Sequence, residues 1–404
     1  MPKRNVAIIF GSRSAEHEVS IITAHQLIGV LDKNKYEIIP IYITKEGDWL
    51  TGDKLLNINT FTKGALPTPS TFDKVYISPS PQNRCVVREN SGLFRSRKRI
   101  PIDVAFPVMH GPHGEDGTLQ GFLELAGIPY VGAGVLGSAV GMDKIAMKAL
   151  FRENNLPTVN YIWCTTNEWK NKPEGIIKRI EDALNYPVFV KPANSGSSIG
   201  VKKAKNTEDL KLALDVASQY DRRIIVDEGV EDVMEVNCSV MGNYDLVASI
   251  CEQPISTGEL LSFDDKYTHE DGATSGMNGA ERVIPAPISA ELTNEIQELS
   301  KKAYRVLDCK GIARVDFLVD KKTEKPYVNE INTIPGSFSF YLWERDEIEF
   351  SQLADKLIEL AFEIHKEKSQ ITYSYSSNLL NRLDMASIKM KKELEDKEAK
   401  GQEG

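Results

Sequence analysis

The fold is decided by the stretch Ile312-Ala-Arg-Val-Asp-Phe-Leu-Val-Asp-Lys-Lys-Thr-Glu-Lys-Pro-Tyr-Val-Asn-Glu-Ile-Asn332. It predicts two apolar strands joined by a polar turn. Arg314 and Asp316 are two residues apart, so their side chains share one face of the first strand. Glu330 and Asn332 have the same spacing on the second strand. Thr323 lies midway between Asp316 and Glu330, and a hairpin centred there places these two acids opposite each other. The same register places Arg314 opposite Asn332.

This cluster of side chains is suited to a metal-dependent reaction. Two opposed carboxylates repel each other unless a cation lies between them. Carboxylate and amide oxygens are ligands for a hard cation such as Mg²⁺, which commonly shares its shell with substrate phosphates. An arginine beside them is suited to stabilising a developing oxyanion or a transferring phosphoryl group. The alternative is a solvated surface hairpin with paired charges.

A second stretch, Val188-Phe-Val-Lys-Pro-Ala-Asn-Ser-Gly-Ser-Ser-Ile-Gly-Val201, favours phosphate binding. A turn rich in glycine and serine between two strands can direct consecutive backbone N–H groups at phosphate oxygens. Lys191, at the end of an apolar strand, is better explained as a phosphate partner than as core. The stretch lacks the Gly-Lys-Ser/Thr ending of a P-loop and leads into a strand. A plain flexible hairpin is the alternative.

The rest of the chain predicts an α/β and α+β protein with several domains. An apolar strand at 5–10, a helix to Leu31 and a strand at 36–43 indicate a parallel sheet at the N-terminus. Residues 45–100 are interpreted as a polar insertion. Short strands between 188 and 241 are typical of an α+β domain. Residues 247–285 are predicted to be loop-rich and to contain a mobile lid.

Composition narrows the classes of function. The chain has 404 residues, of which 41% are hydrophobic and 26% charged, as in globular proteins. A formal net charge of -9 argues against a general nucleic-acid binder. Five cysteines without CxxC spacing argue against a disulfide framework or a zinc site and favour a reduced cytoplasm. The first apolar run is too short for a signal peptide or a membrane span. We therefore expect no nucleic-acid or membrane partner.

Two N-terminal features are candidates for substrate binding. Glu16, at the start of the first helix, is suited to holding an ammonium group. Its structural alternative is an ordinary first-turn acid favoured by the helix dipole. The loop from His110 to Gly117 follows a buried strand, where ligand sites of α/β proteins gather. We interpret it as a substrate-lining loop rather than a metal site. No GxGxxG motif is present, which disfavours an oxidoreductase.

Taken in order, these stretches resemble the D-alanine–D-alanine ligase family, which has the ATP-grasp fold. The resemblance covers the first strand to about residue 365, without the insertion and the tail. The matching stretches are Gly11–Ser20, His110–Gly121, Gly141–Lys144, Lys191–Gly200, Lys266–Tyr267, Gly311–Asp316 and Asn329–Gly336.

The resemblance implies ATP-dependent joining of two small amino acids through an acyl phosphate, with two Mg²⁺ ions that Mn²⁺ can replace. The implied metal ligands are Asp316, Glu330 and Asn332. The implied ATP contacts are Lys144, Lys191, Ser195, Gly196, Ser198, Glu228, Glu235 and Lys266. Among these, Glu228 is implied for adenine, with Asp227 as its alternative, and Glu235 for ribose. The implied catalytic residues are Glu16, Ser197, Tyr267, Arg314 and Gly336. The implied substrate-lining residues are His110, Tyr341 and Leu342.

The resemblance also implies a division into domains and a set of competing functions. The expected parts are 1–135, 136–228, 229–368 and a charged tail at 369–404, with a homodimer formed through the first domain. Tyr341 stands where the family usually has a serine that grips the second substrate's carboxylate. Tyr267 favours an amine nucleophile. The first hypothesis is a D-alanyl-D-alanine ligase serving peptidoglycan synthesis. The competing hypotheses are a D-alanyl-D-lactate or D-alanyl-D-serine ligase and a non-catalytic ATP-binding protein.

Overall fold

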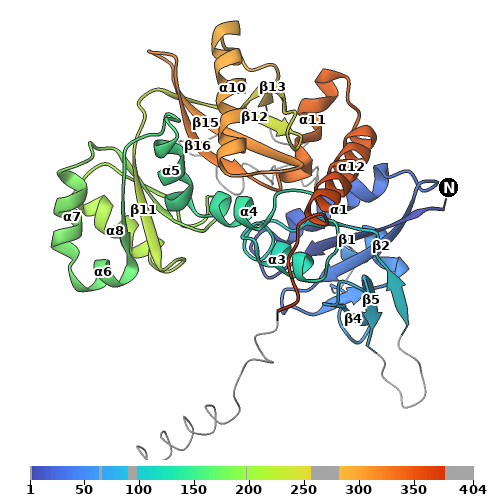
Figure 1. Ribbon diagram of the computed structural model, residues 1–404. Coiled ribbons are helices and arrows are strands. Elements are labelled where there is room, and N and C mark those ends of the chain that lie inside the picture. The colour runs from blue at the N-terminus through green and yellow to red at the C-terminus, as the bar shows by residue number, and fades with distance from the viewer. Residues whose placement is uncertain (1, 63–65, 90–97, 197, 256–281, 378–404) are drawn as a thin grey trace, which may run out of the picture. The chain divides into compact units, whose positions relative to one another are not determined.

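A computed structural model describes residues 2–62, 66–89, 98–196, 198–255 and 282–377 (Figure 1). The chain forms two compact units, residues 1–365 and residues 366–404. The described part of the first unit contains three β-sheets, of seven, four and five strands. The predicted domain boundaries stay predictions, and most of the predicted tail, 378–404, lies outside the described residues.

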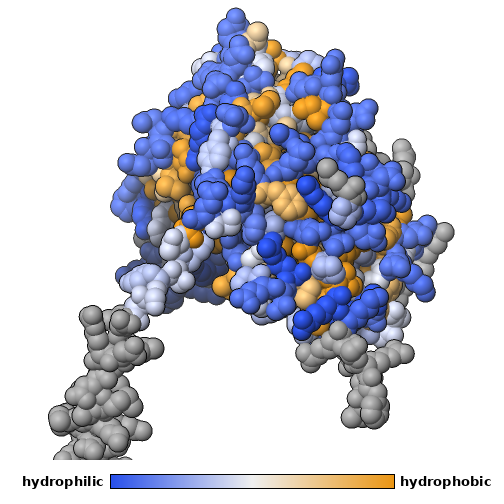
Figure 2. All heavy atoms as spheres, turned by 45° about the vertical axis from the view of Figure 1, so that its right-hand side comes forward, coloured by the Kyte–Doolittle hydropathy of each residue, from blue (hydrophilic) through white to orange (hydrophobic). Residues whose placement is uncertain are grey.

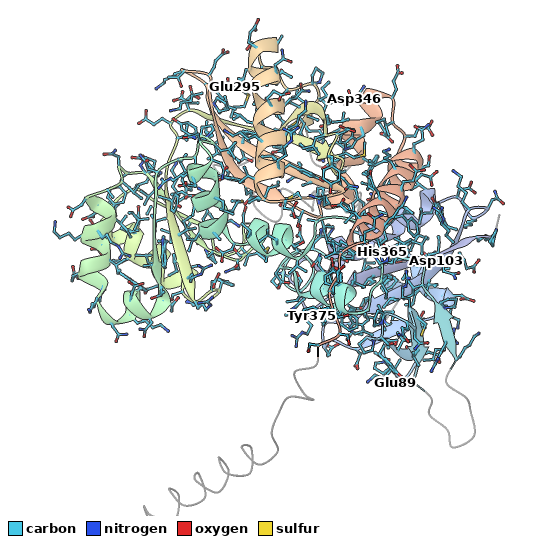
Figure 3. The ribbon with its side chains drawn as sticks, viewed as in Figure 1. Glu89, Asp103, Glu295, Asp346, His365 and Tyr375 are labelled. Carbon is cyan, nitrogen blue, oxygen red and sulfur yellow. The ribbon has the colours of Figure 1, made fainter. Side chains whose placement is uncertain are left out.

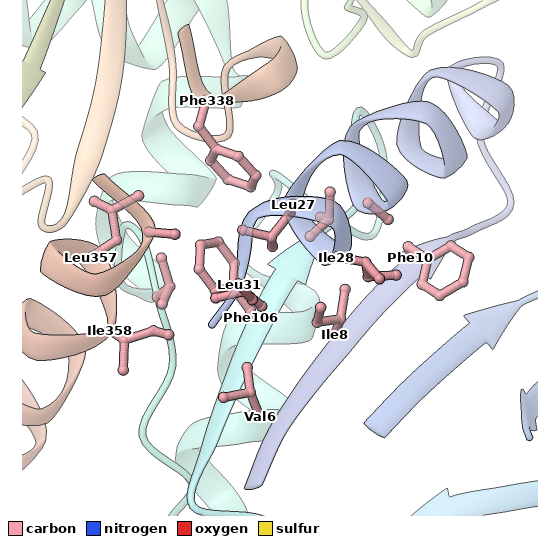
Figure 4. Packing of buried hydrophobic residues seen from close by; sticks show 14 of the residues in the cluster. Val6, Ile8, Phe10, Leu27, Ile28, Leu31, Phe106, Phe338, Leu357 and Ile358 are labelled. Atoms are coloured by element: carbon pink, nitrogen blue, oxygen red, sulfur yellow. The ribbon is translucent and has the colours of Figure 1, made fainter. Parts of the chain in front are cut away.

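The N-terminal sheet has the predicted parallel centre. β1 (Arg4–Gly11) pairs in parallel with β2 (Tyr36–Ile43) and with β7 (Val104–Val108). Val6, Ile8 and Phe10 pack in the cluster that contains α1 (His17–Val30), as Figure 4 shows, while alternate residues of β1 pack with α3 (Thr118–Leu125). Because both faces of β1 are covered, its apolar run is continuous rather than alternating.

The segment interpreted as a polar insertion contains strands of the same sheet. Its described elements are β3 (Trp49–Thr51), η1 (Asp53–Leu56), α2 (Asn59–Thr62), β4 (Asp73–Ile77), β5 (Cys85–Arg88) and β6 (Arg99–Pro101). The strand order is β6-β5-β4-β3-β2-β1-β7, and the pairs from β6 to β2 are antiparallel. Leu50, Val75 and Val86 are buried. The sequence did not predict these strands, because strands of three to five residues give little periodic signal.

The middle sheet is antiparallel, in the order β10-β9-β11-β8. Its strands are β8 (Tyr161–Thr165), β9 (Val188–Pro192), β10 (Lys202–Ala204) and β11 (Arg223–Glu228). In Figure 1, α6 (Thr166–Asn171), α7 (Pro173–Glu181) and α8 (Thr207–Ala217) lie beside this sheet. Two helices, α4 (Val135–Met142) and α5 (Lys144–Glu153), precede it.

The third sheet is antiparallel, in the order β14-β13-β12-β15-β16. Its strands are β12 (Val233–Met241), β13 (Val247–Pro254), β14 (Arg282–Val283), β15 (Ile312–Asp320) and β16 (Lys325–Asn332), and α10 (Ala290–Val306) packs against them. β13 contradicts the prediction that the loop begins at residue 247. The predicted lid itself, at 256–281, lies outside the described residues.

The chain after β16 returns to the N-terminal sheet. It forms η3 (Gly336–Ser339), α11 (Phe340–Trp343), η4 (Glu344–Asp346) and α12 (Phe350–Lys368). Phe338 packs edge-to-face on Phe106 of β7, with ring centroids 5.1 Å apart, and Leu357 and Ile358 of α12 join the same cluster (Figure 4). These contacts fix the loop after β16 against α1 and β7, where the candidate site lies.

The first sheet also has a polar contact at its start. Asp103, labelled in Figure 3, accepts a 2.7 Å hydrogen bond from the N–H of Asn5 and so ties the start of β1 to β7. The face in Figure 2 is mostly hydrophilic, with hydrophobic residues in small groups. No helix among the described residues is long and apolar enough to cross a membrane.

Candidate active site

The C-terminal hairpin has the predicted pairs. Asp316 pairs with Glu330, and Arg314 pairs with Asn332. The hairpin is not centred on Thr323, however, because Asp320 pairs with Lys325 and Phe317 with Val328. Asn329 is therefore the extra residue of a β-bulge, which shifts the ladder by the one residue needed to restore the predicted pairs.

The polar residues of this hairpin continue a row across the sheet. Glu252 on β13 pairs with Asn237 on β12, which pairs with Asp316, which pairs with Glu330. Side chains directly opposite one another on neighbouring strands lie on the same face. All four line one cavity. The sequence predicted the Asp316 and Glu330 end of this row and missed the Asn237 and Glu252 end.

Arg314 and Asp316 form a buried ion pair within this cavity. The guanidinium Nε and Nη2 donate to the two carboxylate oxygens at 2.6 and 2.7 Å. Asn332 Nδ2 donates to the same carboxylate at 2.9 Å. Burial lowers the pKa of Arg314, but Asp316 raises it more, so the pKa lies well above its ordinary value. Arg314 therefore stays charged at neutral pH, as an oxyanion-stabilising arginine needs to be.

The donor set fits a hard cation that also binds phosphate. Two carboxylates and an amide leave several positions of a six-coordinate shell for phosphate oxygens and water. No cluster of three or more His, Cys, Asp or Glu side chains suited to a metal occurs in the described ranges.

Lys144 connects the glycine- and serine-rich loop with the hairpin. Asp143 caps α5 by accepting from the N–H groups of Ile145 and Ala146 at 3.1 and 3.0 Å, and this fixes Lys144 at the first position of the helix. The Lys144 ammonium donates to the Ser195 carbonyl at 2.7 Å and lies 3.5 Å from Glu330 Oε2. It therefore lies between the predicted phosphate loop and the predicted metal ligands.

Lys191 lies on β9 and is held by a buried carboxylate. Its ammonium donates to Asp227 Oδ2 at 2.8 Å and to Asn329 Oδ1 at 3.4 Å. Lys148 lies 2.7 Å from the other oxygen of Asp227. Burial lowers the pKa of Lys191, but Asp227 raises it more, and Glu330 adds to the rise. Lys191 therefore directs its charge toward the hairpin, although it is not among the residues that line the cavity.

Glu228 has mainly local partners. Its carboxylate accepts from the N–H and side-chain amide of Asn185 at 3.0 and 2.9 Å and from Asn160 Nδ2 at 2.8 Å. It does not line the cavity, whereas Glu235 does. Asp227, the second adenine candidate, is buried between two lysines. The geometry thus brings the predicted ribose partner to the site more directly than either adenine candidate.

Glu16 lies where two glycines leave room for its carboxylate. It is the N-cap residue of α1, and its side chain makes no capping hydrogen bond. A Cβ placed on Gly111 or on Gly196 would lie 2.6 or 2.7 Å from Glu16 Oε2. The absence of a side chain at both positions therefore lets their loops approach this carboxylate closely. The arrangement brings the His110 loop, the phosphate loop and the start of α1 together.

Glu115 is a partly buried acid that the prediction did not single out. Its two oxygens accept from the N–H groups of Gly111 and Ile334, both at 2.9 Å. Burial, with a smaller contribution from Glu16, raises its pKa to about 8. His110 Nδ1 donates to the Ile334 carbonyl oxygen at 3.0 Å, and burial lowers the pKa of His110 to about 4, so the ring is neutral at pH 7. The sequence predicts that the loop from His110 to Gly117 lines the substrate, but nothing in it indicates that Glu115 faces Glu16.

The turn after Gly336 has unusual backbone geometry. Ser337, Phe338 and Ser339 have φ values of 51, 53 and 49°, a conformation that non-glycine residues rarely adopt. Thr23 Oγ1 accepts from the Ser337 N–H at 3.3 Å, and Ser337 Oγ donates to Gln26 at 2.6 Å. These contacts to α1 hold the turn, which presents Gly336 and Tyr341 to the cavity.

The cavity collects most of the predicted site. The predicted residues that line it are Glu16, His110, Lys144, Ser195, Gly196, Glu235, Arg314, Asp316, Glu330, Asn332, Gly336 and Tyr341. Those that do not are Lys191, Ser198, Glu228 and Leu342, of which Leu342 is fully buried. Ser197, Lys266 and Tyr267 lie outside the described residues. The charged and amide side chains of the lining that the prediction missed are Glu115, Asn237, Glu252 and Arg282.

The fold and this site define an ATP-grasp protein, in which Lys144 on α5 and Lys191 on β9 extend toward an acidic hairpin. The family models described as D-ala D-ala ligase N-terminus and C-terminus match residues 5–133 and 150–359. The D-alanine–D-alanine ligase of Heliobacterium modesticaldum is 42% identical over 92% of this chain and 98% of its own length. That of Caldicellulosiruptor bescii is 44% identical over 93% and 99%. The chain belongs to the D-alanine–D-alanine ligase family.

Solved structures agree with this assignment. The D-alanine–D-alanine ligase from Coxiella burnetii has a TM-score of 0.76 at 29% identity, covering 92% of this chain and 97% of its own. The VanG D-Ala:D-Ser ligase from Enterococcus faecalis has a TM-score of 0.75 at 32% identity, covering 89% and 100%. The ligase from Bacillus anthracis complexed with ATP has a TM-score of 0.63 at 27% identity, covering 90% and 99%.

Proposed function

We propose that this protein uses ATP to join two D-alanine molecules into D-alanyl-D-alanine, a precursor for peptidoglycan synthesis. The observation that carries the proposal is that Asp316, Glu330, Arg314 and Lys144 line one cavity together with Glu16. This arrangement offers charge neutralisation for phosphates beside a carboxylate suited to an ammonium group. Family membership supplies the identity of the amino acids.

The proposed reaction has two displacements. A carboxylate oxygen of the first amino acid attacks the γ-phosphorus of ATP, the bond to the bridging oxygen breaks, and ADP leaves. The amine of the second amino acid, after losing a proton, attacks the acyl carbon, and phosphate leaves with the electron pair of the C–O bond. The first displacement converts the carboxylate of the first amino acid, a poor electrophile, into a reactive acyl phosphate. Catalysis is chiefly positioning and neutralisation of charge.

Each step has named side chains in this chain. Glu16 holds the ammonium group of the first amino acid, and Lys144 and Lys191 offset phosphate charge. Arg314 and the Gly336 N–H stabilise the oxyanion of the tetrahedral intermediate. Asp316, Glu330 and Asn332 would hold two Mg²⁺ ions, replaceable by Mn²⁺, which when bound neutralise charge on the phosphate oxygens. Ser195, Gly196, Ser198 and Glu235 are assigned to ATP, and Ser197, Lys266 and Tyr267 to closure over the reactants, by resemblance.

A product assay tests the proposal. The full chain is incubated with ATP, Mg²⁺ and either D-alanine or L-alanine, and phosphate and dipeptide are measured in parallel. We expect one phosphate per dipeptide with D-alanine and neither product with L-alanine. Phosphate release that ignores every D-amino acid supplied contradicts the substrate assignment, and release of phosphate without dipeptide contradicts the second displacement.

A D-alanyl-D-serine ligase is the second candidate function, and Tyr341 is the residue that favours it. A tyrosine replaces the serine expected to grip the second carboxylate, so the second subsite is altered. The likeness to the VanG D-Ala:D-Ser ligase points in the same direction. Offering D-alanine, D-serine and D-lactate together across pH 6 to 9, and weighing the three products, separates the candidates.

We also propose an assembly, a location and a division into domains. We propose a homodimer, because Leu125 on α3 and Leu136 on α4 are 73 and 59% exposed on helices in contact with each other. We propose a cytoplasmic location, because all five cysteines are free and buried thiols. The proposed domains are 1–135, 136–228 and 229–368.

A further inference from the structure

We propose that Arg282 binds the carboxylate of the second amino acid, and that Glu252 and Tyr341 position Arg282 for this contact. The inference rests on the proposed function, since it assigns a specificity-determining residue within the same reaction. Arg282 is the first residue of the two-residue strand β14, where it pairs with Pro254 of β13. It lines the cavity together with Glu252 and Tyr341.

The geometry of this cluster fixes the plane of the guanidinium. The Arg282 guanidinium carbon lies 3.9 Å from the centre of the Tyr341 ring. Its Nη1 lies 3.5 Å from Glu252 Oε2, and the side chain is 14% exposed. Glu252, which is 2% exposed, also accepts from Tyr341 Oη at 2.9 Å and from Asn237 Nδ2 at 3.1 Å. The carboxylate is thus held by three donors on three different elements, and it anchors the arginine from one side.

The tyrosine hydroxyl is committed to Glu252 rather than to a substrate. A tyrosine has one O–H to donate, and Tyr341 donates it to Glu252 Oε1. Burial, with Glu252 adding to it, raises the pKa of Tyr341, so the hydroxyl keeps this proton. The side chain that replaces the expected serine therefore does not supply the hydrogen bond that the serine would give. The second carboxylate needs another donor nearby.

Arg282 is suited to be that donor. The cationic side chains that line the described part of the cavity are Lys144, Arg282 and Arg314. Lys144 is bonded to Ser195 and Glu330, and Arg314 is bonded to Asp316 through two nitrogens. Lys144 therefore belongs to the end of the cavity that takes phosphate, and Arg314 is committed to Asp316 and to the oxyanion. Arg282 supplies positive charge at the Tyr341 end.

The stacked arrangement also explains why the residue is an arginine. A guanidinium stacked on an aromatic ring still directs its N–H groups outward in its own plane, where they match the two oxygens of a carboxylate. Tyr341 supplies the ring and Glu252 prevents rotation of the plane. A lysine has the charge but neither the plane nor the fork. Tyr341, in place of the expected serine, and Arg282 therefore act together to bind the carboxylate of the second amino acid.

The test compares two nucleophiles in one vessel. The full chain receives ATP, Mg²⁺, D-alanine and D-alaninamide, and mass spectrometry measures the ratio of D-alanyl-D-alanine to D-alanyl-D-alaninamide. The amide lacks the negative charge that Arg282 is proposed to bind. Because both products come from the same first intermediate, the ratio does not depend on the amount of correctly folded enzyme or on the ATP site.

We expect Arg282→Met to lower this ratio about 10- to 100-fold relative to the unmodified chain, the size typical of a hydrogen bond to a charged group. Arg282→Lys should give an intermediate ratio. Tyr341→Phe keeps the ring but loses the bond to Glu252, and we expect a drop of about 3- to 10-fold. Arg305→Met, an exposed arginine on α10 away from the cavity, is the matched control and should leave the ratio unchanged.

An unchanged ratio in Arg282→Met overturns the inference. If that variant makes neither product, the ratio of Arg282→Lys decides instead, and a value equal to that of the unmodified chain overturns it. Failure of the proposed function looks different: the unmodified chain then makes neither product from D-alanine. A ratio that falls in Arg282→Met and also in Arg305→Met likewise counts against a specific contact.

Discussion

Asp316 shows how several weak predictions combine at a single residue. It accepts hydrogen bonds from Arg314 and Asn332 and lies opposite Glu330 in the ladder. An isolated carboxylate in this buried position would carry a large desolvation cost. The arginine offsets that cost in the protein alone, and cations are proposed to do so during the reaction. The residue therefore matters more to activity than to stability.

We expect Asp316→Asn to lower kcat roughly 100-fold or more, because one charged metal ligand is replaced by a neutral one. Raising the Mg²⁺ concentration should recover part of the loss. Glu324→Gln, in the exposed turn of the same hairpin, is the control and should keep full activity. Initial rates of phosphate release across a Mg²⁺ series measure both effects. Full activity in Asp316→Asn at limiting Mg²⁺ would contradict the assignment.

Glu115 predicts a pH dependence of stability. Its pKa rises from 4.5 in the unfolded chain to about 8 in the fold, so the folded state keeps a proton that the unfolded state has lost. The stability that this provides is complete below pH 4.5 and is lost as the pH rises through about 8. His17, His25 and His110 have lowered pKa values, which act in the opposite direction below pH 6.5. Above pH 6.5 the lowered pKa of Lys148, about 8, still acts in the opposite direction, so the contribution of Glu115 is isolated by comparison with a variant that cannot ionise there.

Between pH 6.5 and 8 we expect the free energy of unfolding to fall by about 2 kcal/mol, since each pKa unit corresponds to about 1.4 kcal/mol. Urea unfolding of the ligand-free protein at several pH values measures the slope. Glu115→Gln, which cannot ionise, should flatten it. An identical slope in the variant shows that the proton is held elsewhere.

At the scale of elements, Lys148 couples helix α5 to strand β11. Its ammonium is 1% exposed and lies 2.7 Å from Asp227, which also holds Lys191. Burial lowers the pKa of Lys148 to about 8 despite this partner. Removing one cation from this trio leaves Asp227 with a single partner in a dry site. The orientation of Lys191, a proposed phosphate contact, depends on the same carboxylate.

We expect Lys148→Met to lower the free energy of unfolding by about 2–3 kcal/mol, less than for a fully orphaned buried charge because Lys191 remains. The KM for ATP should rise while the ratio of dipeptide to phosphate stays the same. Lys178→Met, which breaks an exposed i,i+4 pair with Asp182, is the control and should change neither quantity appreciably. Urea unfolding and initial rates measure the two effects. A stable variant with unchanged KM would show that the trio is not needed to hold Lys191.

The elements also show which parts of the fold were predictable. The parallel centre of the first sheet was predictable because β1 is buried on both faces and therefore uniformly apolar. The pairing of Asp316 with Glu330 was predictable because a hairpin is local, although the bulge at Asn329 was not. β14 was missed because two residues carry no periodic signal. Glu252 was missed because β13 precedes a polar stretch that obscured its end.

At the scale of the whole molecule, the site depends on contacts that no local pattern encodes. Glu115 meets Ile334, and a Cβ on Gly196 would touch Glu16, across more than 150 residues of chain. Each of the three sheets contributes a loop or strand: the loops after β1 and β9, and the β15–β16 hairpin. The sequence indicated the chemical types through resemblance to a family. It did not indicate that Glu252 and Arg282 would meet Tyr341, because this chain differs from the family there.

Exposed apolar side chains on α3 and α4 predict that two whole molecules assemble. The side chains of Leu125, Leu136 and Val135 are in contact with water, and Val135 is 43% exposed. If two copies bury these residues against each other, sedimentation at micromolar concentration should show a dimer. The double variant Leu125→Glu, Leu136→Glu should then be a monomer, because it places charges in an apolar interface. Leu212→Glu, at a residue 66% exposed on α8, is the matched control and should leave the dimer intact. A monomeric unmodified chain, or a dimer that survives the double substitution, would show that this surface is not the interface. Because the cavity is lined from within one chain, the monomeric variant should keep its activity per chain, which distinguishes loss of assembly from loss of fold.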